Sequence, residues 1–257
     1  MSGRALILDC DGVLADTELD GHLVAFNRTF EELGMPFRWS ADEYGPLLRI
    51  GGGKERMRAY LAQHPEIGLG TAEEVDALIV RAHKRKSEIY VELVESGALP
   101  GRPGIARIVR EALDAGWQVA CASTSAEKSV EAVLASVVGS ELRGRMAGVF
   151  AGDVVPAKKP APDIYLLAAE SLGRSPEEIV VIEDSQSGAA AAAAAGMAHI
   201  VTVSHFTADD DFPAAAVIVD VVGDARTPAT VRSGLDVRDD RGVIGVEGLE
   251  RILAARA

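Results

Sequence analysis

Apolar runs and amphipathic segments alternate along the chain from about residue 102 to its end. Residues 105–115 carry apolar side chains at helical spacing up to Gly116, and an unbroken apolar run follows at 119–122. Runs of Val, Ile and Ala without polar alternation are typical of parallel strands that helices cover on both faces. The same pattern predicts helices at 126–138, at 163–172, through the alanines 189–195 and at 246–254, and strands at 149–151, 179–182, 199–203 and 217–219. It therefore predicts an α/β fold around a parallel, Rossmann-like sheet.

The apolar run 5–8 is expected to be a further strand of this sheet, but the segment after it follows a different pattern. Its apolar residues recur at helical spacing in three stripes, and no stretch before Leu99 alternates as a strand does. The stripes contain Leu23, Phe26, Phe30 and Leu33, then Met57, Tyr60 and Leu61, and then residues from Val75 to Leu93. We therefore expect a helical cap at 17–97, inserted into an α/β core formed by 1–16 and 98–257.

Two segments with unusual composition flank these predicted elements. Glycines and prolines at 97–104 predict a second hinge strand where the insertion returns to the core, so the cap is expected to open and close over the core. Residues 227–240 are rich in Arg and Asp, and we expect a solvent-exposed loop there before the last helix.

Two acids stand at the exit of the strand 5–8. Residues two apart in an extended backbone point to the same side, so Asp9 and Asp11 can converge while Cys10 turns the other way. Mg²⁺ prefers a few carboxylates with water and phosphate oxygens, and a carboxylate can also be a covalent nucleophile toward phosphorus. An EF-hand fits badly, because Val13 occupies its next acidic position. These residues alone leave two alternatives, which are phosphoryl-transfer chemistry and an acidic turn that caps backbone amides.

Three further predicted strands end in polar residues, at the edge where an open parallel sheet binds ligands. The first strand is followed by hydroxyl residues at a helix start, where hydroxyls and backbone amides can bind a phosphate; they are Ser123, Thr124 and Ser125. The second is followed by Lys158 and Lys159, whose ammonium groups before a helix can hold an anion. The third ends in a second acidic pair, Glu183 and Asp184, which can complete a cation site. Each feature alone could be a helix cap, but the four strand ends together indicate one site that handles phosphate.

The helical insertion carries two features that favour anions. Glycines 51–53 precede Lys54 at a predicted helix start, and a basic run from His83 to Lys86 lies on the long helix. The glycines are no Walker loop, because Glu55 stands where Ser or Thr is required. Each feature alone has a simple explanation: the glycines can form a turn, and the basic run can be a solvent-exposed helix face. The two features together indicate a second phosphate site.

Composition narrows the possible partners. The chain has 257 residues and a net charge of −13, from 26 Lys and Arg against 39 Asp and Glu, which argues against nucleic acid or anionic membrane as its partner. Cys10 and Cys121 lie in apolar runs and form no CxxC pair, which indicates a reducing cytoplasm. We expect no leader and no membrane span, because no charged segment followed by an apolar one precedes Leu6 and no apolar stretch reaches the roughly 18 residues that a span needs, and we expect a monomer.

The four strand ends resemble the motifs of the haloacid dehalogenase superfamily, over nearly the whole chain. Residues 9–13 look like its first motif, Ser123 its second, Lys159 its third and Glu183-Asp184 its fourth. The resemblance implies that Asp9 attacks phosphorus and that Asp11 acts as acid and then as base. It implies one Mg²⁺, held by Asp9, the backbone carbonyl of Asp11 and Asp184, with Glu183 orienting metal-bound water.

The resemblance also implies roles for the hydroxyl and lysine side chains. Lys159 would stabilise charge on the phosphoryl oxygens, and Ser123 with the amide of Thr124 would hold the phosphoryl group in line. Ser125 is expected to bind substrate beside them.

Within the superfamily, the chain is similar to the CbbY-like branch at 51–56, 83–88, 150–156 and 206–208. The implied reaction is hydrolysis of xylulose 1,5-bisphosphate to xylulose 5-phosphate and phosphate. The substrate-binding residues implied in the cap are Glu18, His22, Gly52, Gly53, Lys54, His83 and Lys86. The segment between Glu18 and His22 departs from many relatives by one additional residue, with Gly21 inside it. The alternatives are a β-phosphoglucomutase-like phosphomutase, another small sugar-phosphate phosphatase, and a sugar-phosphate sensor without turnover.

Overall fold

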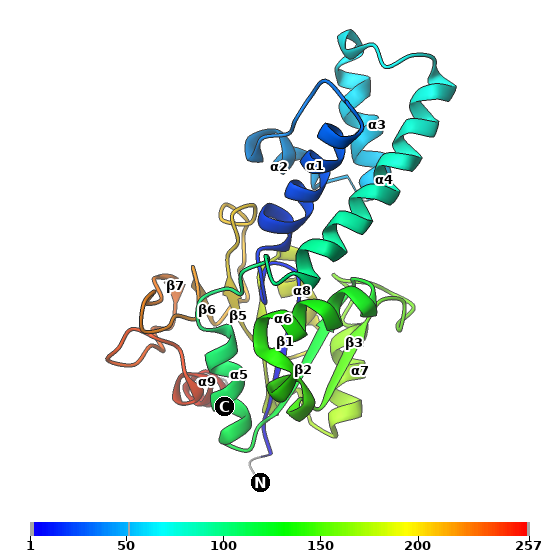
Figure 1. Ribbon diagram of the computed structural model, residues 1–257. Coiled ribbons are helices and arrows are strands. Elements are labelled where there is room, and N and C mark those ends of the chain that lie inside the picture. The colour runs from blue at the N-terminus through cyan, green and yellow to red at the C-terminus, as the bar shows by residue number, and fades with distance from the viewer. Residues whose placement is uncertain (1–2, 51, 256–257) are drawn as a thin grey trace. The chain divides into compact units, whose positions relative to one another are not determined.

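The computed structural model describes residues 3–50 and 52–255, and the chain divides into two compact units. The core unit is Met1–Asp16 with Pro100–Ala257, and the cap unit is Thr17–Leu99 (Figure 1). The boundary at which the chain returns from the cap to the core falls after Leu99, whereas the sequence predicted it after residue 97. None of the described helices is both long and apolar enough to cross a membrane.

The strands of the described core form one sheet in the order β3-β2-β1-β4-β5-β6-β7. They are β1 (Ala5–Leu8), β2 (Gln118–Ser123), β3 (Gly148–Ala151), β4 (Ile179–Glu183), β5 (Ala198–Thr202), β6 (Val217–Val219) and β7 (Val231–Gly234). All neighbours pair in parallel except β6 and β7, which are antiparallel. Chain order reverses between β1 and β4, and such a switch point is where open α/β sheets bind ligands.

Helices cover both faces of this sheet, as the parallel strands require (Figure 1). On one face lie α5 (Ile105–Asp114), α6 (Glu127–Arg145) and α9 (Val246–Ala254), and on the other lie α7 (Asp163–Leu172) and α8 (Gln186–Ala194). A short 3₁₀ turn, Pro176–Glu178, precedes β4. The face under α7 and α8 buries Ala5 and Ile7 of β1 with alanines of α8, and each buried Ile or Val there contributes about 1.5–3 kcal/mol.

The predicted parallel α/β core is confirmed, with helices at 163–172 and 246–254 and a strand at 217–219 ending where the sequence placed them. Two local predictions are wrong. The segment 227–240, expected to be a solvent-exposed loop, contains the strand β7, whose mostly exposed residues do not form the apolar run that marks a buried strand. The helix expected to end at residue 138 resumes after Gly139, which has a φ of 81°, and continues to Arg145.

The return segment 97–104 contributes a single β-bridge, between Ala15 and Gly101, where the sequence predicted a hinge strand. One bridge needs only one matched residue pair, and no side-chain alternation marks it in the sequence.

The cap unit is helical, as its apolar stripes predicted. A π-helical segment, Thr17–Leu23, leads into α1 (Val24–Glu32), which is followed by α2 (Ala41–Leu47), α3 (Gly53–Gln63), a 3₁₀ turn (Pro65–Ile67) and α4 (Ala72–Glu95). Thr71 and Glu74 form a capping box that fixes the start of α4. Phe26 and Phe30 pack against Trp39, with ring centroids 4.9 Å apart in both pairs, and this aromatic cluster is the core of the cap.

Candidate active site

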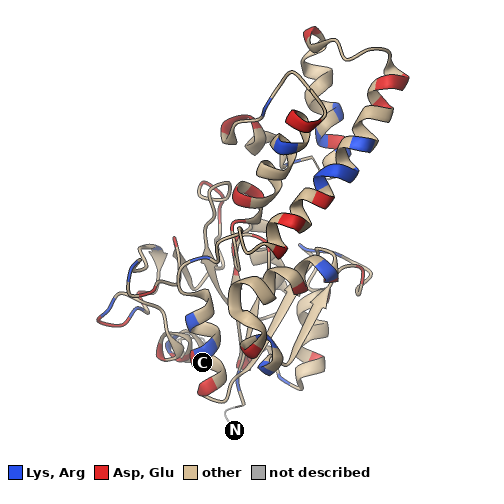
Figure 2. Cartoon of the chain, in the orientation of Figure 1, with Lys and Arg blue, Asp and Glu red and all other residues tan. Residues whose placement is uncertain are grey.

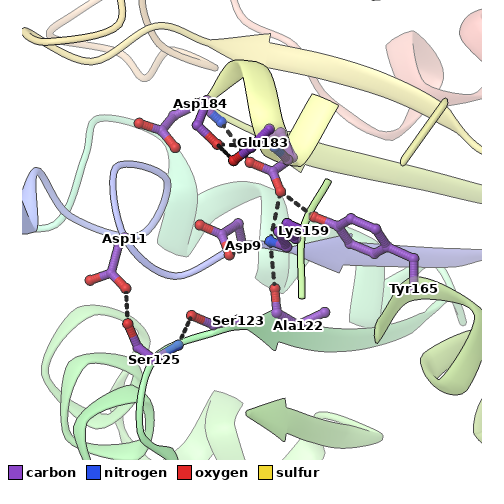
Figure 3. Close-up of polar contacts among 12 residues, drawn as sticks. Asp9, Asp11, Ala122, Ser123, Ser125, Lys159, Tyr165, Glu183 and Asp184 are labelled. Atoms are coloured by element: carbon purple, nitrogen blue, oxygen red, sulfur yellow. Dashed lines mark hydrogen bonds and ion pairs between the residues drawn. The ribbon is translucent and has the colours of Figure 1, made fainter. Parts of the chain in front are cut away.

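Three buried carboxylates meet at the switch point of the core sheet. Parallel pairing sets Leu8 opposite Ile182, and the Asp9 amide continues the ladder by donating to the Ile182 carbonyl at 3.0 Å. This register brings Asp9 next to Glu183 and Asp184, and ligand oxygens of the three lie within 4.8 Å of one another (Figure 3).

The electrostatics of this group fit a divalent cation. Burial raises the pKa of Asp9 to about 7, with Lys159 opposing the shift and Glu183 adding to it. Burial and the neighbouring Glu183 raise the pKa of Asp184 well above its usual range. Carboxylates this close repel one another, and a cation with a preference for hard oxygen ligands relieves that repulsion. The donor set therefore suits Mg²⁺.

We expect the affinity for Mg²⁺ to fall as the solution becomes more acidic. Because the pKa of Asp9 is about 7, that carboxyl is neutral at lower pH, and the cation must then displace its proton. Calorimetric titration at about pH 6 and about pH 8 should show an affinity roughly tenfold weaker at the lower pH. Equal affinities at the two values would contradict the assignment of Asp9 as a ligand.

Of the two predicted lysines, Lys159 is the one that contacts the acidic group. Its Nζ lies 2.6 Å from Asp9 Oδ1, 2.7 Å from Glu183 Oε1 and 3.1 Å from the Ala122 carbonyl. Burial alone lowers the pKa of Lys159, but the two carboxylates outweigh burial and raise the pKa well above its usual range. Lys159 therefore keeps a positive charge beside Asp9, whereas Lys158 is exposed and pairs with Asp153 at 2.8 Å.

The carboxylate of Asp11 has a different neighbour from that of Asp9. The Ser125 hydroxyl donates a hydrogen bond to Asp11 Oδ2, and the Ser125 amide donates to Ser123 Oγ at 3.2 Å (Figure 3). Thr124, between these serines, is partly buried after β2. The structure thus brings the ends of β1 and β2 together. Ser125 is hydrogen-bonded to Asp11, the residue expected to act as acid and then as base.

Arg102, which the sequence did not single out, fixes the loop that carries Asp11. Its guanidinium donates to the carbonyls of Gly12 and Asp220, and also to Thr202 at 2.9 Å and Val203 at 2.7 Å. Burial lowers its pKa. One side chain thereby ties the loop after β1 to the ends of β5 and β6, and only the folded topology shows it.

Glu183 has a tighter set of contacts than the sequence suggested. Its Oε1 accepts from Lys159 and from the Tyr165 hydroxyl, and its Oε2 accepts from the Asp184 amide at 3.1 Å. The sequence missed Tyr165, because a tyrosine in the apolar stripe of a predicted helix is normally a core residue. Its position directly after the lysine motif is the signal that could have identified it.

We expect Gly188→Ala to destabilise the protein and to lower its activity. A Cβ at Gly188 would lie 2.0 Å from Glu183 Cδ and Oε1, so the carboxylate would have to move. Overpacking of this kind costs about 1–3 kcal/mol, which should lower Tm by about 3–9 °C. Gly144→Ala is the matched control, because nothing lies within 4 Å of its Cβ position; a thermal melt in which the two variants behaved alike would contradict the packing.

In the cap, Glu18 belongs to a polar network. The Tyr44 hydroxyl donates to Glu18 Oε2 at 2.7 Å, and Arg56 Nη1 donates to the same hydroxyl at 2.9 Å and lies 3.7 Å from Glu18 Oε2. Neither Tyr44 nor Arg56 was predicted as a site residue. Together they hold the Glu18 carboxylate in place.

A second group in the cap surrounds the ammonium of Lys86. Lys86 is only 8% exposed, and its Nζ lies 2.8 Å from His22 Nδ1. The ammonium also lies 4.9 Å from the ring centroid of Phe26 and 5.3 Å from that of Tyr90. Burial and the charge of Lys86 lower the pKa of His22 well below its usual range, so the imidazole is neutral and can accept from Lys86.

The other predicted phosphate-binding residues of the cap lie near this group. A Cβ on Gly53 would lie 2.8 Å from the His83 ring, so the start of α3 runs against that imidazole. Burial, then the charges of Lys86 and Lys54, lower the pKa of His83. Figure 2 shows the basic positions on both α3 and α4. We call His22, Lys54, His83 and Lys86 the basic cap cluster.

The glycines before α3 have a backbone role. Gly52 has a φ of 93° and precedes the first residue of α3, a conformation that favours glycine. Gly51, the first glycine of the triplet, lies outside the described residues.

The sequence of the chain is similar to proteins of one family. The profile of the haloacid dehalogenase-like hydrolases matches residues 4–196. A CBBY-like protein of Arabidopsis thaliana is 51% identical over 222 residues, which are 86% of this chain and 69% of that protein. The plasmid-encoded protein CbbY of Cupriavidus necator is 42% identical over 228 residues, which are 88% of each chain.

Solved structures show the same similarity in three dimensions. A crystal structure of a CbbY variant from Rhodobacter sphaeroides in complex with xylulose 1,5-bisphosphate superposes with a TM-score of 0.69. It is 37% identical in sequence, and the match covers 85% of this chain and 94% of that one.

Proposed function

The chain belongs to the haloacid dehalogenase-like hydrolases, and from this premise we propose that it is a Mg²⁺-dependent sugar-phosphate phosphatase. The substrate we propose is xylulose 1,5-bisphosphate, which is hydrolysed to xylulose 5-phosphate and phosphate. The bound ligand of the Rhodobacter sphaeroides relative supports this choice.

The observation that carries the proposal is the basic cap cluster in a protein with a net charge of −13. A phosphatase for monophosphates needs one anion site, which the core residues around Asp9 and Lys159 can supply. Lys54 and Lys86 bring positive charge to this cluster, and the imidazoles of His22 and His83, whose pKa values are lowered, can donate ring N–H groups, so the cluster favours a substrate with a second phosphate.

The first chemical step would transfer the phosphoryl group to Asp9. An Asp9 carboxylate oxygen forms a bond to phosphorus while the bond from phosphorus to the sugar oxygen breaks, and Asp11 donates its proton to that oxygen. Lys159, charged and 2.6 Å from Asp9 Oδ1, is placed to balance charge on the phosphoryl oxygens. The Ser123 hydroxyl and the amide of Thr124 would orient the group.

The second step would return the enzyme to its starting state. Asp11, now a carboxylate, takes a proton from water, the water oxygen bonds to phosphorus, and the bond to Asp9 breaks. The hydrogen bond from Ser125 orients the Asp11 carboxylate. Mg²⁺, which Asp9, the Asp11 carbonyl and Asp184 would hold, supplies positive charge that lets the anionic nucleophile approach the anionic phosphate.

The experiment that tests this proposal is an assay of phosphate release with and without Mg²⁺. We expect one phosphate per xylulose 1,5-bisphosphate, loss of release with EDTA, and recovery when MgCl₂ is added in excess. Formation of glucose 6-phosphate from β-glucose 1-phosphate, with little release of phosphate from the bisphosphate, would instead identify a phosphomutase.

A further inference from the structure

Tyr165 is a polar residue in an apolar part of the core. It lies in the first turn of α7 and is fully buried among Ile7, Ala122 and other apolar side chains of the cluster under α7 and α8. A buried phenol costs free energy unless its hydroxyl has a partner. Here the hydroxyl donates to Glu183 Oε1 (Figure 3), so a polar contact within the candidate site offsets the cost.

Tyr165 also contacts Lys159 with the face of its ring. Lys159 Nζ lies 4.9 Å from the ring centroid, within the range of a cation–π interaction. Burial, followed by the neighbouring Glu183, raises the pKa of Tyr165 well above its usual range, so the phenol keeps its proton and remains a donor. One side chain thus contacts both members of the Lys159–Glu183 ion pair.

The contacts of Glu183 leave it little freedom to turn. Oε1 receives Lys159 Nζ at 2.7 Å and the Tyr165 hydroxyl, while Oε2 receives the Asp184 amide at 3.1 Å. The backbone at Gly188 approaches so closely that even a Cβ would not fit beside the carboxylate. Glu183 is fully buried, and both of its oxygens are engaged by donors of the chain itself.

We infer that Tyr165 is a positioning residue, whose hydroxyl fixes Glu183 so that the Lys159 ammonium is shared between Glu183 and Asp9. Glu183 then has the role of holding the Lys159 ammonium. The resemblance to the superfamily had implied a different role, the orientation of metal-bound water. The inference rests on the proposed function in one respect, because it takes Lys159 to balance charge on the transferring phosphoryl group.

The test compares Tyr165→Phe in two backgrounds, the native chain and Lys159→Ala. Phe keeps the ring under the ammonium and removes only the hydroxyl. Turnover is measured with p-nitrophenyl phosphate and with xylulose 1,5-bisphosphate, and binding of orthovanadate with MgCl₂ is measured by calorimetry. Orthovanadate adopts the five-coordinate geometry of a transferring phosphoryl group, so its affinity reports on Lys159 without any turnover.

In the native background we expect kcat to fall about tenfold and orthovanadate to bind about tenfold more weakly, with KM changed less than about twofold. In Lys159→Ala, the same substitution should change each quantity less than about twofold, because the group that it positions is absent. Tyr60→Phe, which removes the hydroxyl of another buried tyrosine, in the cap, should leave all three unchanged and controls for a general effect.

Equal losses in both backgrounds, or no loss in the native one, would overturn the inference. Failure of the proposed function is a separate result, because inactivity toward xylulose 1,5-bisphosphate leaves the p-nitrophenyl phosphate and orthovanadate comparisons to decide on Tyr165. Should Tyr165→Phe not fold, Glu183→Gln, measured at MgCl₂ concentrations that saturate each variant, must give the same losses in the native background and none with Lys159→Ala, and any other outcome overturns the inference.

Discussion

Replacing Asp9 by Asn is expected to lower kcat by about 10⁴-fold or more, because an amide cannot form the phosphoryl-enzyme intermediate. Asn has nearly the same shape and keeps a carbonyl oxygen within reach of Lys159, so the fold should persist. The rate is measured as phosphate release under saturating Mg²⁺, and circular dichroism checks the fold. Asp209→Asn, at an exposed acid of the core, is the matched control and should keep native activity.

The same variant should alter how stability depends on pH in the absence of metal. The folded pKa of Asp9, about 7, lies above its unfolded value near 3.8, so the folded state binds more protons between these values. The native metal-free protein therefore loses stability as pH rises through that window, and Asp9→Asn should lose less. An Asn variant with native turnover, or with an unchanged stability profile, would contradict the role given to Asp9.

Lys54→Ala is expected to discriminate between substrates with one phosphate and substrates with two. A charge-assisted hydrogen bond to a phosphate contributes roughly 1.5–3 kcal/mol, so kcat/KM for xylulose 1,5-bisphosphate should fall by about 10–100-fold. The value for p-nitrophenyl phosphate should change less than about twofold, since the reacting phosphate binds to core residues.

Lys84→Ala is the matched control for this prediction, because Lys84 is an exposed lysine on α4 outside the basic cap cluster. It removes the same charge from the same unit and should leave both substrates unaffected. Equal losses for both substrates in Lys54→Ala, or losses as large in Lys84→Ala, would show that Lys54 acts through general charge or stability and not through a second phosphate.

The core elements could be predicted because each carries its own local signal. Buried strands such as 179–182 are continuous apolar runs, and the helix 163–172 ends at Gly173, which adopts the left-handed conformation of a helix end. β7 carries no such signal, because Arg232 and Ser233 are exposed and only its pairing with β6 makes it a strand.

The partners of the site side chains could be predicted only in part. The strand-end rule indicated that Asp9 and Lys159 would meet although 150 residues separate them, and their contact at 2.6 Å agrees with it. The position of Tyr165 after the lysine motif could have marked it as a candidate site residue, but the sequence does not show that it donates to Glu183 or that Arg102 donates to four carbonyls, because such contacts depend on how helices and loops pack against the sheet.

The most direct test of the proposed activity is a comparison of kcat/KM across a panel of phosphorylated sugars with Mg²⁺ present. The panel contains xylulose 1,5-bisphosphate, ribulose 1,5-bisphosphate, fructose 1,6-bisphosphate, xylulose 5-phosphate and β-glucose 1-phosphate. We predict a kcat/KM for xylulose 1,5-bisphosphate at least about tenfold above every other member, as one well-placed phosphate contact would give. A monophosphate hydrolysed as efficiently as that bisphosphate would contradict the proposed function.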